Sequence, residues 1–486
     1  MQPSDPCPAP HLAHRLLDGP AHALADAVRQ REISATAVTE AAIARIEASN
    51  PRVNSFTRQT LARALREAAA LDQRLAGCDT TAQALPLLGV PYAVKNLFDI
   101  AGVTTVAGSK VERDGAPAAR DAVLVQRMAA AGAVLLGALN MDEYAYGFTT
   151  ENSHDGACHN PHDLARSAGG SSGGSAAAIA AGQVPLTLGS DTNGSIRVPS
   201  SLCGVFGLKP TYGRLPRTGS YPFVASLDHL GPFARSVTDL ALSYDALQGP
   251  DMHDPGQVAR PLEPTLATLA AGTAGLRIGV LGGWFQDMAN AEARTAVQRV
   301  AAALGATTTV HWAGAERARA AAFLISNAAG ANLHLDDLKA RPQDFEPLSR
   351  DRFLAGALLP ATWVVQAQRV RRWFARQVAA SFADVDVLLA PATPCVAPLL
   401  GTEWLEIGGQ RLPARPSLGL LTQPVSCIGL PVCTVPVWGC ASEPALQHLP
   451  VGVQLIAAPW REDRVLRVAR ALEIAGVVRA PVAALD

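Results

Sequence analysis

A lysine stands at the end of an apolar run in the stretch GVPYAVKNLFDIAG, residues 89–102. The chain has 41 lysines and arginines, and only four of them are lysines: Lys95, Lys110, Lys209 and Lys339. Arginine keeps its charge at neutral pH, whereas a buried lysine can lose its proton there. Lys95 is therefore a candidate proton acceptor. The alternative is a structural lysine that pairs with Asp99 or Asp191.

Three serines in a second stretch, residues 168–204, are candidate nucleophiles: Ser171, Ser172 and Ser195. The sequence GGSSGGS alone is typical of a flexible linker. The alanine-rich helix predicted after it indicates an ordered turn instead, because glycines permit unusual backbone conformations. Gly169, Ser171 and Gly173 also fit G-x-S-x-G, the nucleophile elbow, with Ser171 attacking. That interpretation needs a histidine base, and the candidates are His229, His334 and His448.

A third interpretation joins Lys95, Ser171 and Ser195 in one proton relay. The chain here resembles the amidase signature family, over roughly residues 22–475. The resemblance rests on four stretches that follow one another in family order: GVPYAVKNLFDIAG, AGGSSGGSAAAIAAG, GSDTNGSIRVPSSLCGVFGLKPTYGR and LPVGVQLIAAPWREDRVLRVARALE. The separation of 24 residues between Ser171 and Ser195 is also the one that the family shows.

The resemblance implies an amidase with a Ser-Ser-Lys triad. Ser195 would attack the amide carbonyl and form an acyl-enzyme, and Ser171, preceded by a cis peptide bond, would link it to Lys95. Amide hydrolysis needs an activated nucleophile, a stabilised oxyanion and a proton for the leaving nitrogen. Burial disfavours the ammonium form, so a neutral Lys95 amine can take the serine proton and return it to the leaving group.

The loop around the proposed nucleophile supplies the other expected groups. Backbone N–H groups of Thr192, Asn193, Gly194 and Ser195 would form the oxyanion hole. Many family members have glycine at position 193, and the asparagine here would put a polar amide into the acyl pocket. Asp191 and Arg197 are predicted to form a supporting ion pair. Ser172 is expected to support the site beside Ser171.

Three further stretches, residues 140–156, 219–236 and 350–373, resemble the 1-carboxybiuret (biuret-type) amidohydrolases of cyanuric acid degradation. They resemble the glutamine-hydrolysing subunit of the tRNA-dependent amidotransferase more weakly. In that amidotransferase subunit, the arginine at the position that matches Arg352 binds a substrate carboxylate. A guanidinium can bind a carboxylate through two parallel hydrogen bonds. Arg352 is the expected anchor of a carboxylated ureide, and Tyr146 is expected at the pocket entrance. A surface arginine is the alternative for Arg352.

Three functions stay open at this point. The first is a hydrolase that releases ammonia from a small amide or ureide. The second is a glutamine-hydrolysing subunit of an amidotransferase, and the third is a catalytically silent scaffold of a complex. The resemblance also implies a homodimer of the catalytic chain and a small accessory subunit.

Composition narrows the class of protein. The 41 basic and 42 acidic residues leave a net charge of −1, without the basic face that a nucleic-acid binder needs. No apolar run approaches the ~18 residues of a membrane span, and no secretory signal is visible, so a cytoplasmic enzyme is expected. Eight scattered cysteines without a C-x-x-C pair indicate reduced, mostly buried thiols. No cofactor is expected. His154, Cys158, His159 and His162 cluster, but their spacing fits no usual zinc pattern.

The elements that must position these residues alternate between strands and helices. This pattern predicts an α/β amidase signature fold, in which helices cover both faces of a twisted mixed sheet. We expect an N-terminal extension at 1–21 with residues 1–20 loose on the surface, one catalytic domain at 22–475, and a tail at 476–486. A linker at 248–257 would lead into a helical insertion at about 250–383. Helices are predicted from cap Ser34 to Asn50-Pro51, from cap Asp121 to Gly132, and over 291–304, 361–383 and 463–475. Strands are predicted at 276–281, 385–391, 432–437 and 451–457.

Overall fold

The computed structural model describes residues 9–485. Eleven strands form one mixed sheet in the order β1-β3-β2-β8-β10-β9-β16-β17-β13-β11-β12. Their bounds are β1 Phe56–Gln59, β2 Pro91–Lys95, β3 Val134–Leu139, β8 Leu186–Asp191, β9 Phe206–Lys209, β10 His229–Ala234, β11 Ile278–Leu281, β12 Thr308–Val310, β13 Val387–Pro391, β16 Val432–Val437 and β17 Val451–Ala457. Three two-stranded ribbons pair β4 Glu151–Asn152 with β5 Gly156–Ala157, β6 His159–Asn160 with β7 Asp163–Ser167, and β14 Trp404–Ile407 with β15 Gln410–Pro413.

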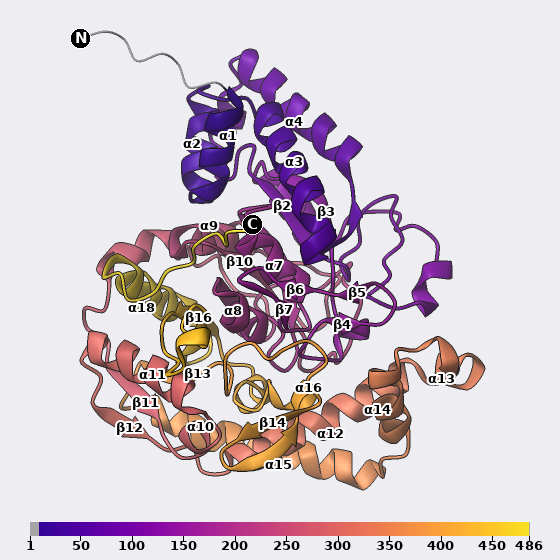
Figure 1. Ribbon diagram of the computed structural model, residues 1–486, viewed down its shortest axis with the longest axis vertical. Coiled ribbons are helices and arrows are strands. Elements are labelled where there is room, and N and C mark those ends of the chain that lie inside the picture. Colours follow the sequence, from indigo (N-terminus) through magenta and orange to yellow (C-terminus); the bar gives the residue numbers. More distant parts are fainter. Residues whose placement is uncertain (1–8, 486) are drawn as a thin grey trace.

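Helices lie against both faces of the sheet (Figure 1). The central strands β2, β8, β10, β9, β16, β17 and β13 are buried at every position, which requires cover on both sides. The helices are α1 Ala9–Asp18, α2 Ala21–Arg29, α3 Ala35–Val53, α4 Leu61–Ala76, α5 Thr80–Gln83, α6 Val123–Ala130, α7 Gly173–Ala180, α8 Arg197–Cys203, α9 Val237–Leu247, α10 Trp284–Asp287, α11 Ala291–Leu304, α12 Ala315–Leu333, α13 Leu335–Ala340, α14 Pro347–Ala357, α15 Ala361–Ser381, α16 Ala414–Ser417, α17 Gln423–Cys427 and α18 Glu462–Ile474.

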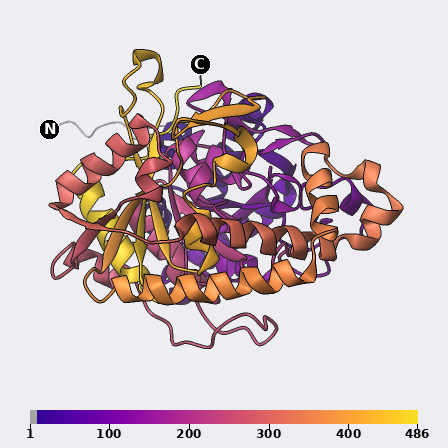
Figure 2. The ribbon, with the colours of Figure 1, turned by 90° about the horizontal axis from the view of Figure 1, so that it is seen from below.

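The α/β fold with a mixed sheet confirms the prediction from the sequence. Strands β11, β13, β16 and β17 and helices α11, α15 and α18 lie where the hydrophobic patterns predict them. The segment predicted as a helical insertion, residues 250–383, holds α10 to α15, and α12 packs against α15 (Figure 2). The same segment adds β11 and β12 to the edge of the sheet.

Two predicted helix boundaries are wrong. The first helix begins at cap Ser34, as predicted, but continues through Pro51 to Val53. A proline in the last turn removes only one hydrogen bond, and the turn is closed by Asn54, whose N–H donates to the Asn50 carbonyl at 2.7 Å. The second predicted cap, Asp121, does not cap α6.

The Asp121 carboxylate is engaged elsewhere. Arg63 binds it through both Nη atoms at 2.7 Å, and α6 begins at Val123 without a side-chain cap. Arg63 gives this carboxylate two charge-assisted hydrogen bonds and the Ala101 N–H donates to it at 2.8 Å, so both of its oxygens are engaged away from α6.

The expectation that residues 1–20 lie loosely is wrong for the part that the structure describes. Residues 9–18 form α1, which packs against α3 and buries Ala13 and Leu17. Residues 1–8 lie outside the described residues. At the other end of the chain, the N–H of Ala483 donates to the Ala180 carbonyl of α7 at 2.7 Å.

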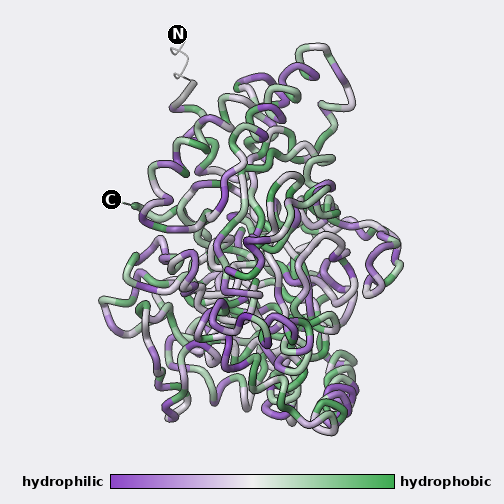
Figure 3. The backbone as a smooth tube through the Cα atoms, turned by 90° about the vertical axis from the view of Figure 1, so that its right-hand side faces the viewer, coloured by the Kyte–Doolittle hydropathy of each residue, from purple (hydrophilic) through white to green (hydrophobic). Residues whose placement is uncertain are grey.

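Hydrophobic and hydrophilic stretches alternate along the backbone (Figure 3). Within residues 9–485, no helix has both the length and the apolar character needed to cross a membrane. Six of the seven free cysteines in this range are buried, and Cys78 is exposed.

Candidate active site

Lys95 is the last residue of β2 and is fully buried. Its Nζ lies 2.6 Å from Ser171 Oγ and 2.9 Å from Ser190 Oγ. The carboxylates that could have paired with it have other partners, since Asp99 accepts from Thr105 and Asp191 binds Arg197. Lys95 therefore contacts hydroxyls, which is the arrangement that a proton relay needs.

Burial lowers the pKa of Lys95 to about 7. The negative charges of Asp142, Asp191 and Asp228 raise this pKa, but their effect is smaller than that of burial. A substantial fraction of the amine is then neutral at neutral pH. A neutral amine has the lone pair that a general base requires, and its pKa near the working pH favours transfer in both directions.

The loop between β7 and α7 presents Ser171 to Lys95. The Gly170–Ser171 peptide bond is cis, as the family resemblance implies, and Gly169 has a φ of +77°. A Cβ on Gly170 would lie 2.1 Å from Asp142 Oδ2, so this approach excludes any side chain. Ser172 connects the loop to β8, because its Oγ donates a hydrogen bond to the Ser190 carbonyl at 3.1 Å.

Ser190 is a site residue that the sequence interpretation missed. Strands β2 and β8 are parallel neighbours, with Val94 opposite Leu188, so their carboxyl ends meet at one edge of the sheet. This neighbourhood brings Ser190 to Lys95 although 95 residues separate them. Its position at the end of a buried strand was the available signal, but the order of strands was needed to use it.

The loop of Ser195 is braced by the buried pair of Asp191 and Arg197. The guanidinium donates to both carboxylate oxygens, from Nε at 2.9 Å and from Nη2 at 3.0 Å. Burial alone would raise the pKa of Asp191, but Arg197 outweighs this effect and holds that pKa below its usual value. Arg197 Nη1 also donates to Gln454 at 2.7 Å and to the Thr422 carbonyl at 3.0 Å. The pair thus ties the loop to β17 and α17.

Within the described chain, the backbone N–H groups of residues 192–195 donate to no protein acceptor. Gly194 has a φ of +142°, and a Cβ there would lie 2.1 Å from Thr422 Oγ1. Thr422 in turn donates to the Asn193 carbonyl at 2.7 Å. The loop is held in place while its amides stay available, so they can stabilise an oxyanion beside Ser195.

A small pocket adjoins Ser195. Besides Ser195, Thr192 and Asn193 from the loop, it is lined by Ala145, Tyr146, Gly147, Phe148, Phe223, Phe323, Ser326, Arg352 and Gln423. The Arg352 guanidinium stacks 3.7 Å above the Tyr146 ring, and its Nη1 donates to the Tyr146 carbonyl at 3.3 Å. The Tyr146 hydroxyl donates to Asn327 on α12. Arg352 is thus half-buried at the pocket wall and is not a free surface arginine.

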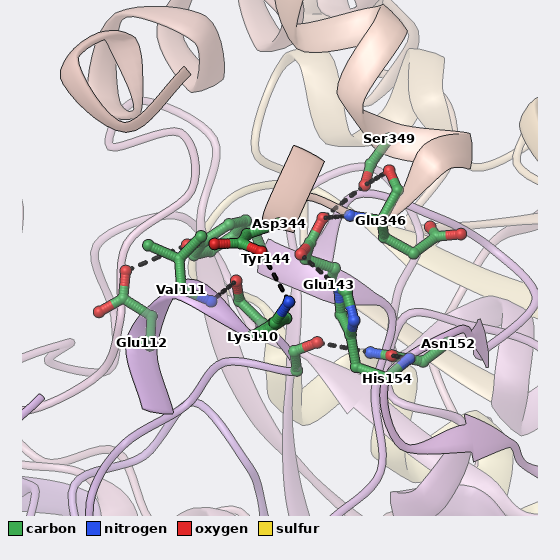
Figure 4. Close-up of polar contacts among 12 residues, drawn as sticks. Lys110, Val111, Glu112, Glu143, Tyr144, Asn152, His154, Asp344, Glu346 and Ser349 are labelled. Atoms are coloured by element: carbon green, nitrogen blue, oxygen red, sulfur yellow. Dashed lines mark hydrogen bonds and ion pairs between the residues drawn. The ribbon is translucent and has the colours of Figure 1, made fainter. Parts of the chain in front are cut away.

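Helix α14, which carries Arg352, is anchored to the loop that carries Tyr146. The buried Glu143 carboxylate accepts from the Glu346 N–H and from Ser349 Oγ, each at 2.8 Å (Figure 4). His154 Nε2 lies 3.1 Å from the other oxygen of Glu143. Lys110 pairs with Asp344 at 2.7 Å just before this helix. The ionic and polar contacts hold α14 against the pocket.

None of the three candidate histidines hydrogen-bonds Ser171, Ser172 or Ser195. His229 donates from Nδ1 to the Leu227 carbonyl at 2.6 Å, and His334 packs its ring 3.8 Å from that of Tyr144. His448 is exposed and lies 4.0 Å from Asp163. The nucleophile-elbow interpretation with a histidine base is therefore wrong, because Ser171 meets Lys95.

The residues His154, Cys158, His159 and His162, which are close in the sequence, do not form one metal-binding group in the structure. His159 lies 2.7 Å from the Leu164 carbonyl, and His162 lies 3.1 Å from the Cys203 carbonyl. Among the residues that the structure describes, no three His, Cys, Asp or Glu side chains gather as a metal site requires.

A family model described as Amidase matches residues 37–466. The chain belongs to the amidase signature family. It is 60% identical, over 92% of its length and 96% of the relative, to AtzE, the 1-carboxybiuret hydrolase subunit of Pseudomonas sp. (strain ADP). It is 38% identical, over 92% of its length and 94% of the relative, to one subunit of the glutamyl-tRNA(Gln) amidotransferase of Anaeromyxobacter dehalogenans (strain 2CP-C).

A solved structure confirms the fold of this family member. That structure is described as a vestigial protein complex that reveals the evolutionary origins of an s-triazine catabolic enzyme. It superposes with a TM-score of 0.93 at 58% identity and covers 95% of this chain and all of the other. The amidase is accordingly a hydrolase of amide C–N bonds.

Proposed function

We propose that this amidase hydrolyses a small carboxylated ureide of the 1-carboxybiuret type and releases ammonia. The observation that carries the proposal is the contact of buried Lys95 with Ser171, next to a loop that offers Ser195 and free amides to a pocket bearing Arg352. The 60% identity to a 1-carboxybiuret hydrolase subunit supports the substrate class.

In the acylation step, the Ser195 hydroxyl passes its proton through Ser171 to the neutral Lys95 amine, and its oxygen attacks the substrate carbonyl carbon. The negative charge on the carbonyl oxygen is stabilised by the amides of residues 192–195. The C–N bond then breaks as the proton returns from Lys95 through Ser171 to the nitrogen, which leaves as ammonia. Ser195 retains the acyl group.

In the second step, water loses a proton through Ser171 to Lys95 and attacks the acyl-enzyme. The bond to Ser195 Oγ breaks, this oxygen takes the proton back, and the acid product leaves. The relay is unchanged after the cycle, so no cofactor is needed for this chemistry.

Arg352 would hold the substrate carboxylate, and Tyr146 would support its guanidinium. The guanidinium lies at the pocket wall with its plane stacked on Tyr146, and the fork of Arg352 can bind a carboxylate through two hydrogen bonds. Replacing Arg352 with methionine removes the charge and keeps much of the apolar stem. We expect the KM for 1-carboxybiuret to rise about 10- to 100-fold, as removal of a charged hydrogen bond predicts.

The direct test measures ammonia release by the purified chain from 1-carboxybiuret and from glutamine. Release from the ureide supports the proposal. Release from glutamine alone would instead support the second candidate, a glutamine-hydrolysing subunit, which the 38% identity to the glutamyl-tRNA(Gln) amidotransferase chain favours. A chain that is silent toward both substrates and unreactive with a fluorophosphonate would be a scaffold.

We also propose that the chain works as a homodimer and with a small accessory subunit. The description of the related solved structure as a protein complex supports the presence of a partner subunit. Mass measurement of the tagged chain purified from its native source tests both, because two catalytic chains and a small second chain have distinct masses.

A further inference from the structure

The side chain of Asn193 reaches into the pocket beside Ser195 and is 8% exposed. Its Nδ2 donates to Ser326 Oγ on α12 at 2.8 Å. Among the described residues, its Oδ1 has no hydrogen-bond partner. A buried carboxamide oxygen without a partner is costly, so it indicates a group that a ligand satisfies.

The orientation of this carboxamide follows from its neighbour. Ser326 uses its hydroxyl proton to donate to the Ala322 carbonyl at 2.8 Å. Its oxygen can then only accept, so the Asn193 group that faces Ser326 must be the NH₂. Oδ1 is therefore the atom left for the pocket, and α12 holds it there.

A second carboxamide lies nearby. Gln423, the first residue of α17, lines the same pocket at 2% exposed, and its Oε1 also lacks a partner among residues 9–485. The wall next to the nucleophile thus combines the acceptor of Asn193 and the carboxamide of Gln423 with the cation of Arg352. A ligand with a carboxylate and an N–H in its acyl part matches this set, whereas an acyl part without an N–H would leave Asn193 Oδ1 unpaired.

We propose that Asn193 Oδ1 determines specificity by accepting a hydrogen bond from an N–H in the acyl part of the substrate. This inference rests on the proposed function and narrows its substrate to acyl groups in which nitrogen, not carbon, flanks the attacked carbonyl. The backbone N–H of Asn193 is assigned to the oxyanion, whereas its side-chain Oδ1 is assigned to the acyl part of the substrate.

Biuret and malonamide give the test, because they differ only in N–H against CH₂ between two carbonyls. Each compound is measured for its ability to protect Ser195 from a fluorophosphonate, a readout that does not depend on turnover. We expect the wild type to bind biuret more tightly than malonamide. Asn193→Ala is expected to reduce this preference about 10- to 100-fold, mainly by weakening biuret.

Two variants separate recognition from loop support. Asn193→Asp keeps an acceptor in the pocket and is expected to retain a preference for biuret. Ser326→Ala releases the carboxamide and is expected to weaken the preference without abolishing labelling of Ser195. Gln377→Ala, an exposed carboxamide on α15, is the matched control and should leave protection by both compounds unchanged.

Equal weakening of biuret and malonamide by Asn193→Ala would overturn the inference, as would a wild type that does not prefer biuret. The proposed function is judged by a different result, the release of ammonia from 1-carboxybiuret by the wild type. A chain that turns over glutamine but loses its biuret preference in Asn193→Ala would contradict the function and support the recognition by Asn193.

Discussion

Lys95 and Lys209 are both fully buried in one sheet, yet they meet different partners. Lys95 on β2 contacts the hydroxyls of Ser171 and Ser190, whereas Lys209 on β9 donates to the Pro210 carbonyl at 3.0 Å. Burial lowers the pKa of each amine to about 7. Burial thus makes either amine able to act as a base, and contact with a serine hydroxyl distinguishes Lys95.

The activity should depend on pH through Lys95. Because the neutral amine is the active form and its pKa lies near 7, kcat/KM should rise as the pH increases through about 7 and then level off. Lys209→Met should keep this profile, since Lys209 does not contact the relay. A rising limb that disappears in Lys209→Met, or a rate that falls from pH 6 to 8, would contradict the assignment.

Replacing Lys95 separates its charge from its basicity. Lys95→Met should lower kcat by about 10³-fold or more, at the upper part of the range for losing a general base. It should not reduce the thermal midpoint, because burying a methionine avoids the desolvation of an amine. Lys95→Arg should be equally inactive, since arginine does not give up its proton. Near-normal turnover of Lys95→Arg would exclude a neutral base.

The nucleophile can be identified by covalent labelling. A fluorophosphonate should form one adduct on the wild type and none on Ser195→Ala, with circular dichroism unchanged because the substitution removes one atom. Ser171→Ala should label slowly, since the link to Lys95 is lost. Ser442→Ala, an exposed serine, serves as the control. Peptide mass mapping that locates the adduct on Ser171 would reverse the two roles.

Ser190 should act as a positioning residue for Lys95. Its hydroxyl lies 2.9 Å from Nζ, so Ser190→Ala leaves the amine with one fixed contact. We expect kcat to fall about 10-fold, a loss of roughly 1.4 kcal/mol, with KM nearly unchanged. Ser190→Thr keeps a hydroxyl and should restore most of the activity. A purely structural role would instead lower the thermal midpoint of both variants without this split.

The Asp191–Arg197 pair should contribute to the stability of the fold. Both side chains are fully buried, so Arg197→Met leaves an unpaired buried carboxylate, at a cost of about 3–5 kcal/mol in the free energy of unfolding. The combined variant with Asp191→Asn should be less destabilised than the sum of the single changes. Denaturant titrations measure all three. Additive losses would show that the two residues act independently.

Much of this fold could be predicted from patterns within single elements. The apolar runs at β13, β16 and β17 and the helical stretch at α11 lie where expected, because local periodicity determines such elements. Local patterns failed where a distant group competed. Asp121 is a good cap by type, but Arg63 binds it across 58 residues.

The candidate site also contains residues that the sequence predicted and features that only the tertiary structure showed. Lys95, Ser171 and Ser195 stand in sequence motifs whose residue types already limit the chemistry to that of a base and two hydroxyls. Ser190 carries no such motif, and only the parallel pairing of β2 with β8 brings it to Lys95. Likewise, the asparagine at position 193 is visible in the sequence, but its free Oδ1 follows from the contact with Ser326 on α12.

The sequence by itself thus determined the family, the type of chemistry and most of the elements, because these depend on residue type and local spacing. The tertiary structure decided which hydroxyls meet Lys95, how far its pKa falls and which atom of Asn193 faces the pocket. These properties depend on burial and on contacts between segments that lie far apart in the chain, and neither is contained in a local pattern.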